Sequence, residues 1–236
     1  MGDSFAVKVF ADGADLDAIL ALAEDPRIAG FTTNPTLMWK AGLTDYQDFA
    51  ERLLERITTH PISFEVFADD IDEMRRQAKL IASWGENVYV KIPVTTTTGE
   101  SMAPLVRELS EDGVKVNVTA LFTTAQVELL TAAVKDGAPS YLSVFAGRIA
   151  DAGIDPMPIM AKSVSIMLDA PRSELIWASP REILNVVQAD QVGCHIITMT
   201  HDLLAKLGSL GKDLDQFSLE TVQMFRRDAQ AAGFSL

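Results

Sequence analysis

Short apolar segments rich in Val, Ile, Phe and Tyr recur along the whole chain, and each is followed by a stretch with helical spacing. The eight segments are residues 6–11, 30–34, 62–68, 88–94, 114–121, 141–146, 174–179 and 194–200. Several are too continuously apolar to leave one face in water, which is typical of strands in a parallel sheet that is covered on both faces. Parallel neighbours need long crossover connections, and the helical stretches can supply them. Eight such units predict an α/β fold, a closed (β/α)8 TIM barrel.

The length of 236 residues is close to the roughly 250 residues of a one-domain barrel. No Gly/Ser-rich or Pro-rich linker divides the chain, so we expect a single domain over residues 1–236. An open doubly wound sheet shares the alternating pattern, but no G-x-G-x-x-G motif follows the first segment. The barrel is therefore favoured, and its chemistry should lie at the carboxyl ends of the strands.

The formal net charge of -13 opposes broad contact with nucleic acid or with an anionic membrane. No apolar run is long enough to span a bilayer, and the N-terminus has no cationic region followed by an apolar stretch. The single cysteine, Cys194, cannot form an internal disulfide and is expected to be a buried core thiol. We therefore expect a cytoplasmic protein with no nucleic-acid partner and no membrane partner, in which local cations bind any anionic ligand.

Lys91 is the residue of the predicted strands that most needs an explanation. Strand alternation places its side chain on the same face as Tyr89 and Pro93, which we expect to be the barrel interior. Burial disfavours the charged form of an amine, and a neutral amine attacks ketones. The structural alternative is a strand lysine that extends to water, which is the commoner fate of an isolated lysine.

Polar residues in four other predicted strands can face the same pocket: Asp12, Asn34, Glu65 and Thr119. Asp and Asn commonly cap helices, and for Asn34 this interpretation is as good as a functional one. Glu65 is harder to explain by structure alone. Alternation places it on one face with Ser63 and Phe67, and an interior carboxylate needs a partner such as a lysine or an ordered water.

The segment Ser179-Pro180-Arg181-Glu182 matches a capping box with proline at the first helical position. The amide groups at such a helix N-terminus also favour a phosphate. Arg148 and Arg181 can add bidentate contacts to the same anion, although either can instead form a surface ion pair. The three histidines lack the spacing of a catalytic zinc site, which disfavours a metal-dependent aldolase.

The chain contains seven segments in a characteristic order: FADGAD, GFTTNPT, FEVFA, VYVKIPV, NVTALFTTAQ, SVFAGRI and WASPRE. Together they resemble the motif set of the transaldolase and fructose-6-phosphate aldolase family, in its short-chain branch, over almost the whole chain. The resemblance implies that Lys91 forms a Schiff base, that Asp12 is the acid/base, and that Glu65 and Thr119 hold a catalytic water. It also implies a set of substrate-binding residues, of which the last three hold the phosphate: Thr33, Asn34, Ser143, Phe145, Arg148, Ser179 and Arg181. No metal and no cofactor are implied.

Two positions bear on the reaction within this family. These positions hold Glu65 and Phe145 in this chain. The resemblance implies glutamate and phenylalanine there in transaldolases, and glutamine and tyrosine in aldolases. The resemblance therefore implies transfer of a dihydroxyacetone unit between a phosphorylated ketose and an aldose, as in the pentose phosphate pathway. The alternatives are fructose-6-phosphate aldolase-type cleavage, transfer on a modified sugar such as a sulfonated one, and an inactive barrel that binds a sugar phosphate.

Three positions depart from the family's common residues: Gly13, Thr36 and Val144. The loop at 94–101 is also slightly extended, which leaves the identity of the donor and acceptor sugars open. Short-chain members commonly form rings of five or ten subunits through a C-terminal helix. The amphipathic pattern at about 217–233 permits this role, so a homo-oligomer, pentamer or decamer, is expected. The same helix can equally cover its own barrel.

Overall fold

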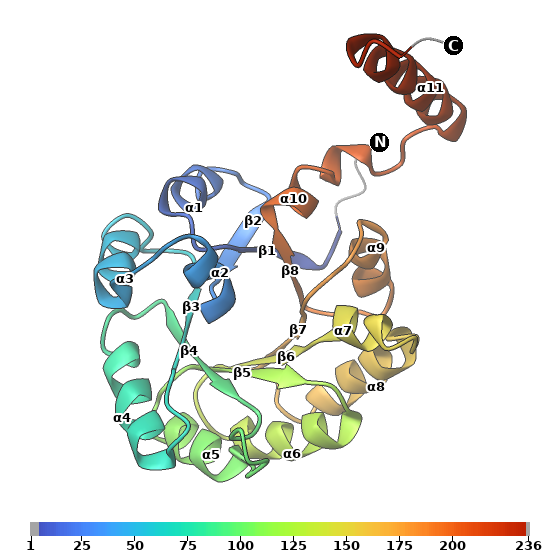
Figure 1. Ribbon diagram of the computed structural model, residues 1–236. Helices are drawn as coiled ribbons and strands as arrows, with labels where there is room; N and C mark the ends of the chain where they lie inside the picture. Colours follow the sequence, from blue (N-terminus) through green and yellow to red (C-terminus); the bar gives the residue numbers. More distant parts are fainter. Residues whose placement is uncertain (1–4, 235–236) are drawn as a thin grey trace. The chain divides into compact units, whose positions relative to one another are not determined.

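Eight parallel strands close into a barrel in the order β1 to β8 in the computed structural model, which describes residues 5–234. The helices of residues 5–204 surround this barrel (Figure 1). The strands are β1 (Lys8–Asp12), β2 (Ile28–Thr32), β3 (Ile62–Glu65), β4 (Val88–Pro93), β5 (Val116–Leu121), β6 (Tyr141–Val144), β7 (Glu174–Trp177) and β8 (Ile196–Thr200). Each overlaps one of the eight predicted segments, and the predicted (β/α)8 barrel is confirmed.

Of the ten helices within residues 5–204, five begin at a side-chain cap. They are α1 (Leu16–Leu22), α2 (Pro35–Lys40), α3 (Tyr46–Leu54), α4 (Ile71–Ala82), α5 (Ala103–Glu111), α6 (Thr124–Val134), α7 (Ala146–Asp151), α8 (Met157–Met167), α9 (Leu184–Gln191) and α10 (His201–Leu204). In α4, for example, the Asp70 carboxylate accepts from the Glu73 amide, and the buried positions Met74, Ala78 and Ile81 repeat at helical spacing. This apolar face holds the helix against the barrel.

Aromatic rings fill the amino-terminal half of the barrel interior. Tyr89 stacks on Tyr141 with ring centroids 4.0 Å apart, and Phe10 meets Tyr141 edge to face. Gly30 provides the space for Phe10, because a Cβ at this position would lie 2.5 Å from the phenyl ring. The interior is therefore closed below, and polar side chains lie toward the carboxyl ends of the strands.

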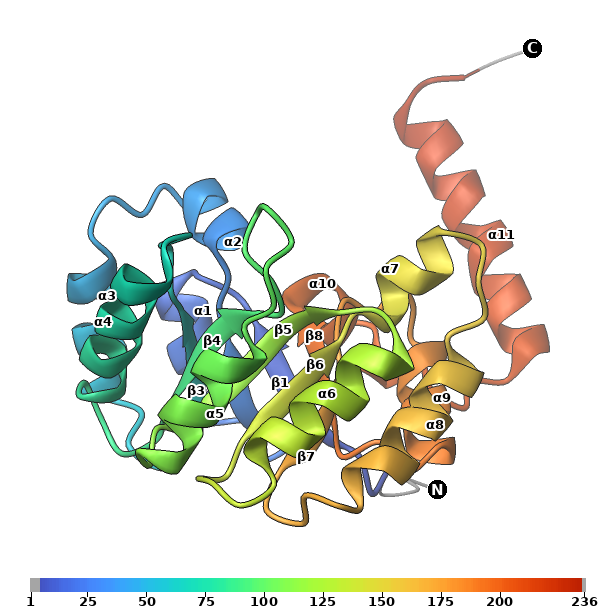
Figure 2. The same ribbon diagram turned by 90° about the horizontal axis from the view of Figure 1, so that it is seen from below.

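The loops that follow the strands gather at one end of the barrel, where α2, α7 and α10 also lie (Figure 2). The loop after β4 contains an antiparallel bridge between Thr95 and Ser101. Asp69, in the loop after β3, accepts hydrogen bonds from the Thr97 amide at 2.7 Å and from its hydroxyl at 2.5 Å. The extended loop is thus held at the end of the barrel where the strands finish.

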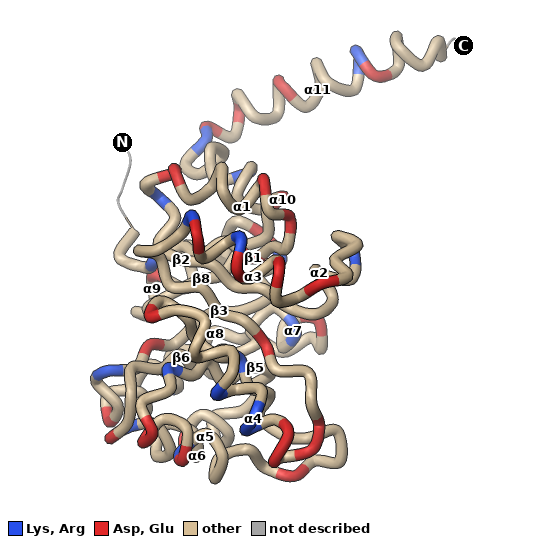
Figure 3. The backbone as a smooth tube through the Cα atoms, turned by 90° about the vertical axis from the view of Figure 1, so that its left-hand side faces the viewer, with Lys and Arg blue, Asp and Glu red and all other residues tan. Residues whose placement is uncertain are grey.

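Charged residues lie mainly on the helices and loops, with acidic and basic positions close together along the tube (Figure 3). Ion pairs between neighbouring turns account for part of this pattern, as in the pairs of Arg75 with Asp72 and of Arg76 with Glu73 on α4. Among residues 5–234, no helix has both the length and the apolar character that a membrane crossing requires.

Residues 205–234 belong to a second compact unit. It contains a 3-10 turn, η1 (Leu207–Ser209), and the helix α11 (Leu214–Ala231). Asp213 caps α11 by accepting from the Gln216 amide, and Lys212 pairs with Glu220. The helix predicted at about 217–233 is therefore present, although it begins and ends slightly earlier. Its packing on a neighbouring subunit stays a prediction.

Candidate active site

Lys91 lies inside the barrel on β4, where it pairs in register with Glu65 of β3. Only 7% of the residue is exposed. Its Nζ donates a hydrogen bond to the Thr33 carbonyl oxygen at 2.7 Å and lies 3.1 Å from Glu65 Oε2. The partner that the Glu65 carboxylate requires is therefore the Lys91 amine, and the two groups form an ion pair that is largely but not fully buried.

Asp12 ends β1 beside this pair. Its Oδ1 accepts from the Thr32 hydroxyl at 2.8 Å, and its Oδ2 accepts from Asn34 Nδ2 at 3.3 Å. Burial raises the pKa of the Asp12 carboxyl, and the Lys91 charge and the two hydrogen bonds lower it in part. The Thr32 hydroxyl also lies 2.6 Å from the Thr198 hydroxyl on β8, so two hydroxyls in series lead to the half-buried Asp12.

Tyr46, on α3, fixes the backbone of Glu65. Its hydroxyl accepts from the Glu65 amide at 2.7 Å and donates to the Glu65 carbonyl at 3.1 Å. Phe67, which alternation placed on the face of Glu65, is 53% exposed. That expectation is wrong because β3 ends at Glu65 and the chain turns, with Gln77 Oε1 accepting from the amides of Phe67 and Ala68.

A buried row of polar side chains lies next to Lys91 on β5, β6 and β3. Ser143 Oγ donates to Asn117 Oδ1 at 2.7 Å, and Asn117 Nδ2 donates to Ser63 Oγ at 3.0 Å. Asn117 pairs in register with Lys91, and alternation places it on the face of Thr119. Asn117 is a buried polar residue that was missed at the level of the sequence, although its place two residues before Thr119 was a usable signal.

The candidate residues near Asp12 and Lys91 differ in which of their atoms contact the site: some use the backbone and others the side chain. Thr33 is fully buried and its hydroxyl donates to the Ser63 carbonyl at 2.9 Å, so it offers Lys91 its backbone oxygen instead. Asn34 caps α2 through its Oδ1 and contacts Asp12 through its Nδ2, so both interpretations of Asn34 apply. Thr119 is buried on β5 just before Ala120, whose φ of 63° marks a register shift.

The capping box expected at Ser179-Pro180-Arg181-Glu182 is wrong. Helix α9 begins at Leu184, and its N-cap, Ile183, makes no side-chain cap. Ser179 has a φ of 56°, whereas an N-cap residue has extended backbone. Asn185 Oδ1 caps the loop instead, accepting from the amides of Arg181 and Glu182 at 2.7 and 3.2 Å.

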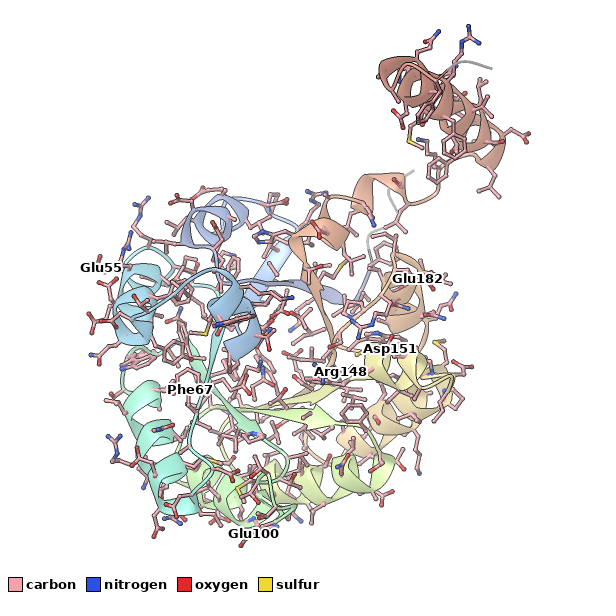
Figure 4. The ribbon with its side chains drawn as sticks, viewed as in Figure 1. Glu55, Phe67, Glu100, Arg148, Asp151 and Glu182 are labelled. Carbon is pink, nitrogen blue, oxygen red and sulfur yellow. The ribbon has the colours of Figure 1, made fainter. Side chains whose placement is uncertain are left out.

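The two candidate phosphate-binding arginines lie at α7 and at the loop after β7. The Arg148 guanidinium lies over the Phe145 ring, 5.1 Å from its centroid. Arg181 pairs with Asp151. Asp151 follows Arg148 by about one helical turn, and Figure 4 labels these two residues. Gly147 holds the two segments together: its amide donates to the Ala178 carbonyl, and a Cβ would lie 1.5 Å from the Ser179 oxygen.

Cys194 is buried, as expected, and burial raises the pKa of its thiol to about 12. Its neighbour His195 accepts a hydrogen bond from the Leu175 amide through Nδ1. The Cys194 thiol donates to the Leu175 and Ile196 carbonyl oxygens, so each side chain has a backbone partner of its own. His201 Nε2 is buried without a hydrogen-bond partner beside Gly13. Within residues 5–234, no three His, Cys, Asp or Glu side chains are grouped as metal ligands.

The buried amine and the two carboxyl groups lie at the strand ends of a (β/α)8 barrel, which is where barrel enzymes place their active sites. Residues 9–236 match the family model described as Transaldolase/Fructose-6-phosphate aldolase. The chain belongs to this transaldolase and fructose-6-phosphate aldolase family.

Two bacterial relatives that are named as transaldolases agree with this assignment. A "Probable transaldolase" of Streptococcus equi subsp. zooepidemicus is 37% identical over 202 residues, covering 85% of this chain and 90% of the relative. "Probable transaldolase 2" of Listeria monocytogenes is 37% identical over 207 residues, covering 86% and 89%. A crystal structure from Burkholderia cenocepacia, a "putative lyase/mutase", has a TM-score of 0.60 at 16% identity, covering 94% of this chain and 84% of that one. The last likeness concerns the fold alone.

Proposed function

We propose that this protein is a metal-independent transaldolase that moves a dihydroxyacetone unit from a phosphorylated ketose to an aldose through a Schiff base on Lys91. The observation that carries the proposal is the buried Lys91 amine, whose Nζ lies 3.1 Å from Glu65 Oε2. Its charge also acts on Asp12, where it lowers the pKa of the carboxyl against the effect of burial. Burial raises the pKa of Asp12 at the same site, and acids with perturbed pKa values cluster at functional sites.

The first step forms the covalent intermediate. The Lys91 amine attacks the C2 carbonyl of the ketose, and the carbinolamine loses its oxygen as water to give a protonated imine. Glu65 contacts the amine directly and is placed to accept and return protons during this exchange. Thr119, two residues beyond the register partner of Lys91, assists by holding the departing water.

The second step breaks the C3–C4 bond. Asp12 removes the proton of the C4 hydroxyl, the C3–C4 electron pair moves into the protonated imine, and an aldose phosphate leaves. Burial raises the pKa of Asp12, which makes it a stronger base than an ordinary aspartate. The three-carbon enamine then attacks an aldehyde acceptor, Asp12 returns its proton to the new hydroxyl, and water releases the product ketose.

Transfer is favoured over simple cleavage by the residue at position 145. Phe145 has no hydroxyl with which to orient a water, and its ring is covered by Arg148. The three-carbon intermediate is therefore expected to wait for an acceptor. Release of dihydroxyacetone at the same rate with and without an acceptor aldehyde would favour the cleavage alternative.

The test of the covalent step is reductive trapping. Borohydride added with fructose 6-phosphate is expected to leave a three-carbon adduct on Lys91, detected by peptide mass spectrometry. Lys91→Arg should abolish the adduct. Lys115→Arg is a matched control, since Lys115 donates to the Glu86 carbonyl just before β5, at the opposite end of the barrel. An unmodified Lys91 under saturating substrate would contradict the proposed mechanism.

A further inference from the structure

Asp151 occupies the candidate phosphate site, although it has no role in the chemistry above. Arg181 Nε donates to both of its carboxylate oxygens, at 3.0 and 3.1 Å, and Arg181 Nη2 donates to Oδ2. These bonds use one whole edge of the guanidinium, which is an edge that a phosphate would use for bidentate binding. The Asp151 carboxylate therefore competes for Arg181 with the phosphate group of the substrate, called its anionic tail below.

Asp151 also faces Arg148. The two residues are three positions apart on α7, which places them on one side of the helix (Figure 4). The hydrogen bonds from Arg181 lower the pKa of the Asp151 carboxyl, and the Arg148 charge adds to this effect. Asp151 is thus ionised at neutral pH, and the two arginines and this carboxylate carry a combined charge of only +1.

The ion pair between Arg181 and Asp151 is weak, but the two segments that carry these residues are fixed against each other. The side chains of Arg181 and Asp151 are 47% and 52% exposed, and ion pairs this exposed are worth little in water. An arriving anion can therefore take Arg181 away from Asp151. The contact of Gly147 with Ser179 fixes α7 against the loop that carries Arg181, so the displaced carboxylate remains beside the bound anion.

We infer that Asp151 is a specificity-determining residue of the anion site. It pairs with Arg181 while the site is empty, and it repels the substrate tail once the tail is bound. Coulomb repulsion is proportional to the charge of the tail, so Asp151 weakens a dianionic phosphate more than a monoanionic sulfonate. This inference rests on the proposed function, in which Arg148 and Arg181 bind the tail.

The experiment measures anion affinity directly in the full-length protein. Isothermal titration with inorganic phosphate at about pH 8, where the dianion predominates, is compared with titration by methanesulfonate. For Asp151→Asn we expect about tenfold tighter binding of phosphate and about threefold tighter binding of methanesulfonate. Asp112→Asn is the matched control, because Asp112 is 51% exposed and pairs with Lys79 at 2.8 Å before β5, at the other end of the barrel. It removes the same charge and should leave both affinities unchanged.

The outcomes separate the inference from the proposed function. Equal gains for the two anions, no gain for phosphate, or weaker phosphate binding in Asp151→Asn would overturn the role of Asp151. Reductive trapping with dihydroxyacetone, which has no anionic tail, tests Lys91 independently in the same variants. A missing adduct beside the expected phosphate gain would reject the Schiff-base chemistry and leave the role of Asp151 supported.

Discussion

Asp12 illustrates how a single residue is held in an unfavourable state at this site. Its carboxylate accepts hydrogen bonds from Thr32 and Asn34 and is coupled to the Lys91 charge, yet burial outweighs these contacts and raises its pKa. The folded protein thus binds the Asp12 proton more tightly than the unfolded chain does. Residues retained for chemistry commonly reduce stability in this way.

The pH dependence of stability follows from the raised pKa of Asp12. The usual pKa of the side chain is 3.8, and the folded-state value is higher. As pH rises through the interval between the two, the folded state loses stability, and the full penalty is present above the folded-state pKa. Asp12→Asn cannot ionise, so we expect it to be more stable than the wild type at neutral pH.

Thermal unfolding of the wild type and of Asp12→Asn, at neutral pH and at about pH 4, measures this effect. The advantage of Asp12→Asn should be largest at neutral pH and should disappear at the acidic end, and the variant should lose transfer activity. Asp136→Asn, at an exposed position, should show no comparable gain. A wild type that is the more stable protein at neutral pH would count against the unfavourable burial of Asp12.

At the scale of single residues, strand alternation identified the side chains that face the barrel interior. Lys91 and Glu65 lie on one interior face because their strands pair in register. Tyr46 could not be found in this way, since its hydroxyl reaches the Glu65 backbone only through the packing of α3 against β3. Ser179 was misinterpreted as a cap because its left-handed backbone cannot be read from the residue type.

At the scale of elements, the joint between α7 and the loop after β7 sets the geometry of the candidate anion site. Gly147 lies in α7 with its Cα against the Ser179 carbonyl, and no side chain fits between them. The sequence shows a glycine in SVFAGRI but not this close approach, which depends on two segments about 30 residues apart.

Gly147→Ala should therefore separate α7 from the loop. A Cβ there would lie 1.5 Å from the Ser179 oxygen and 3.4 Å from Arg181 Cγ. We expect a loss of about 1 to 3 kcal/mol in the free energy of unfolding and weaker binding of phosphate. Gly208→Ala is a suitable control, since nothing lies within 4 Å of the added Cβ. Chemical denaturation and phosphate titration measure both effects, and unchanged values in Gly147→Ala would show that the joint is not rigid.

At the scale of the whole molecule, α11 is the element whose role the barrel does not define. It belongs to the second compact unit and carries apolar residues such as Leu214, Phe217, Val222 and Phe225 along an amphipathic helix. We propose that this face packs on a neighbouring subunit in a ring of five or ten chains. Burial of such a face between subunits would be driven by the hydrophobic effect.

Phe225→Glu should weaken this assembly, because a charge placed in an apolar interface is costly to desolvate. Light scattering coupled to size exclusion is expected to give a multiple of the 25.7 kDa chain for the wild type and a smaller mass for the variant. Gln223→Glu adds a charge at a polar position of the same helix and should leave the mass unchanged. A wild type that elutes as a single chain would contradict the role proposed for α11.

The sequence by itself determined the barrel and the interior positions of its main candidate residues, because strand alternation and crossover spacing are local patterns that a chain carries in its residue order. It therefore located Lys91, Glu65 and Asp12. Only the tertiary structure decided which groups satisfy them, since these partners come from distant segments. The pairing of Arg181 with Asp151 is of this second kind: both residues are visible in the sequence, but their contact exists only because α7 and the loop after β7 meet at Gly147.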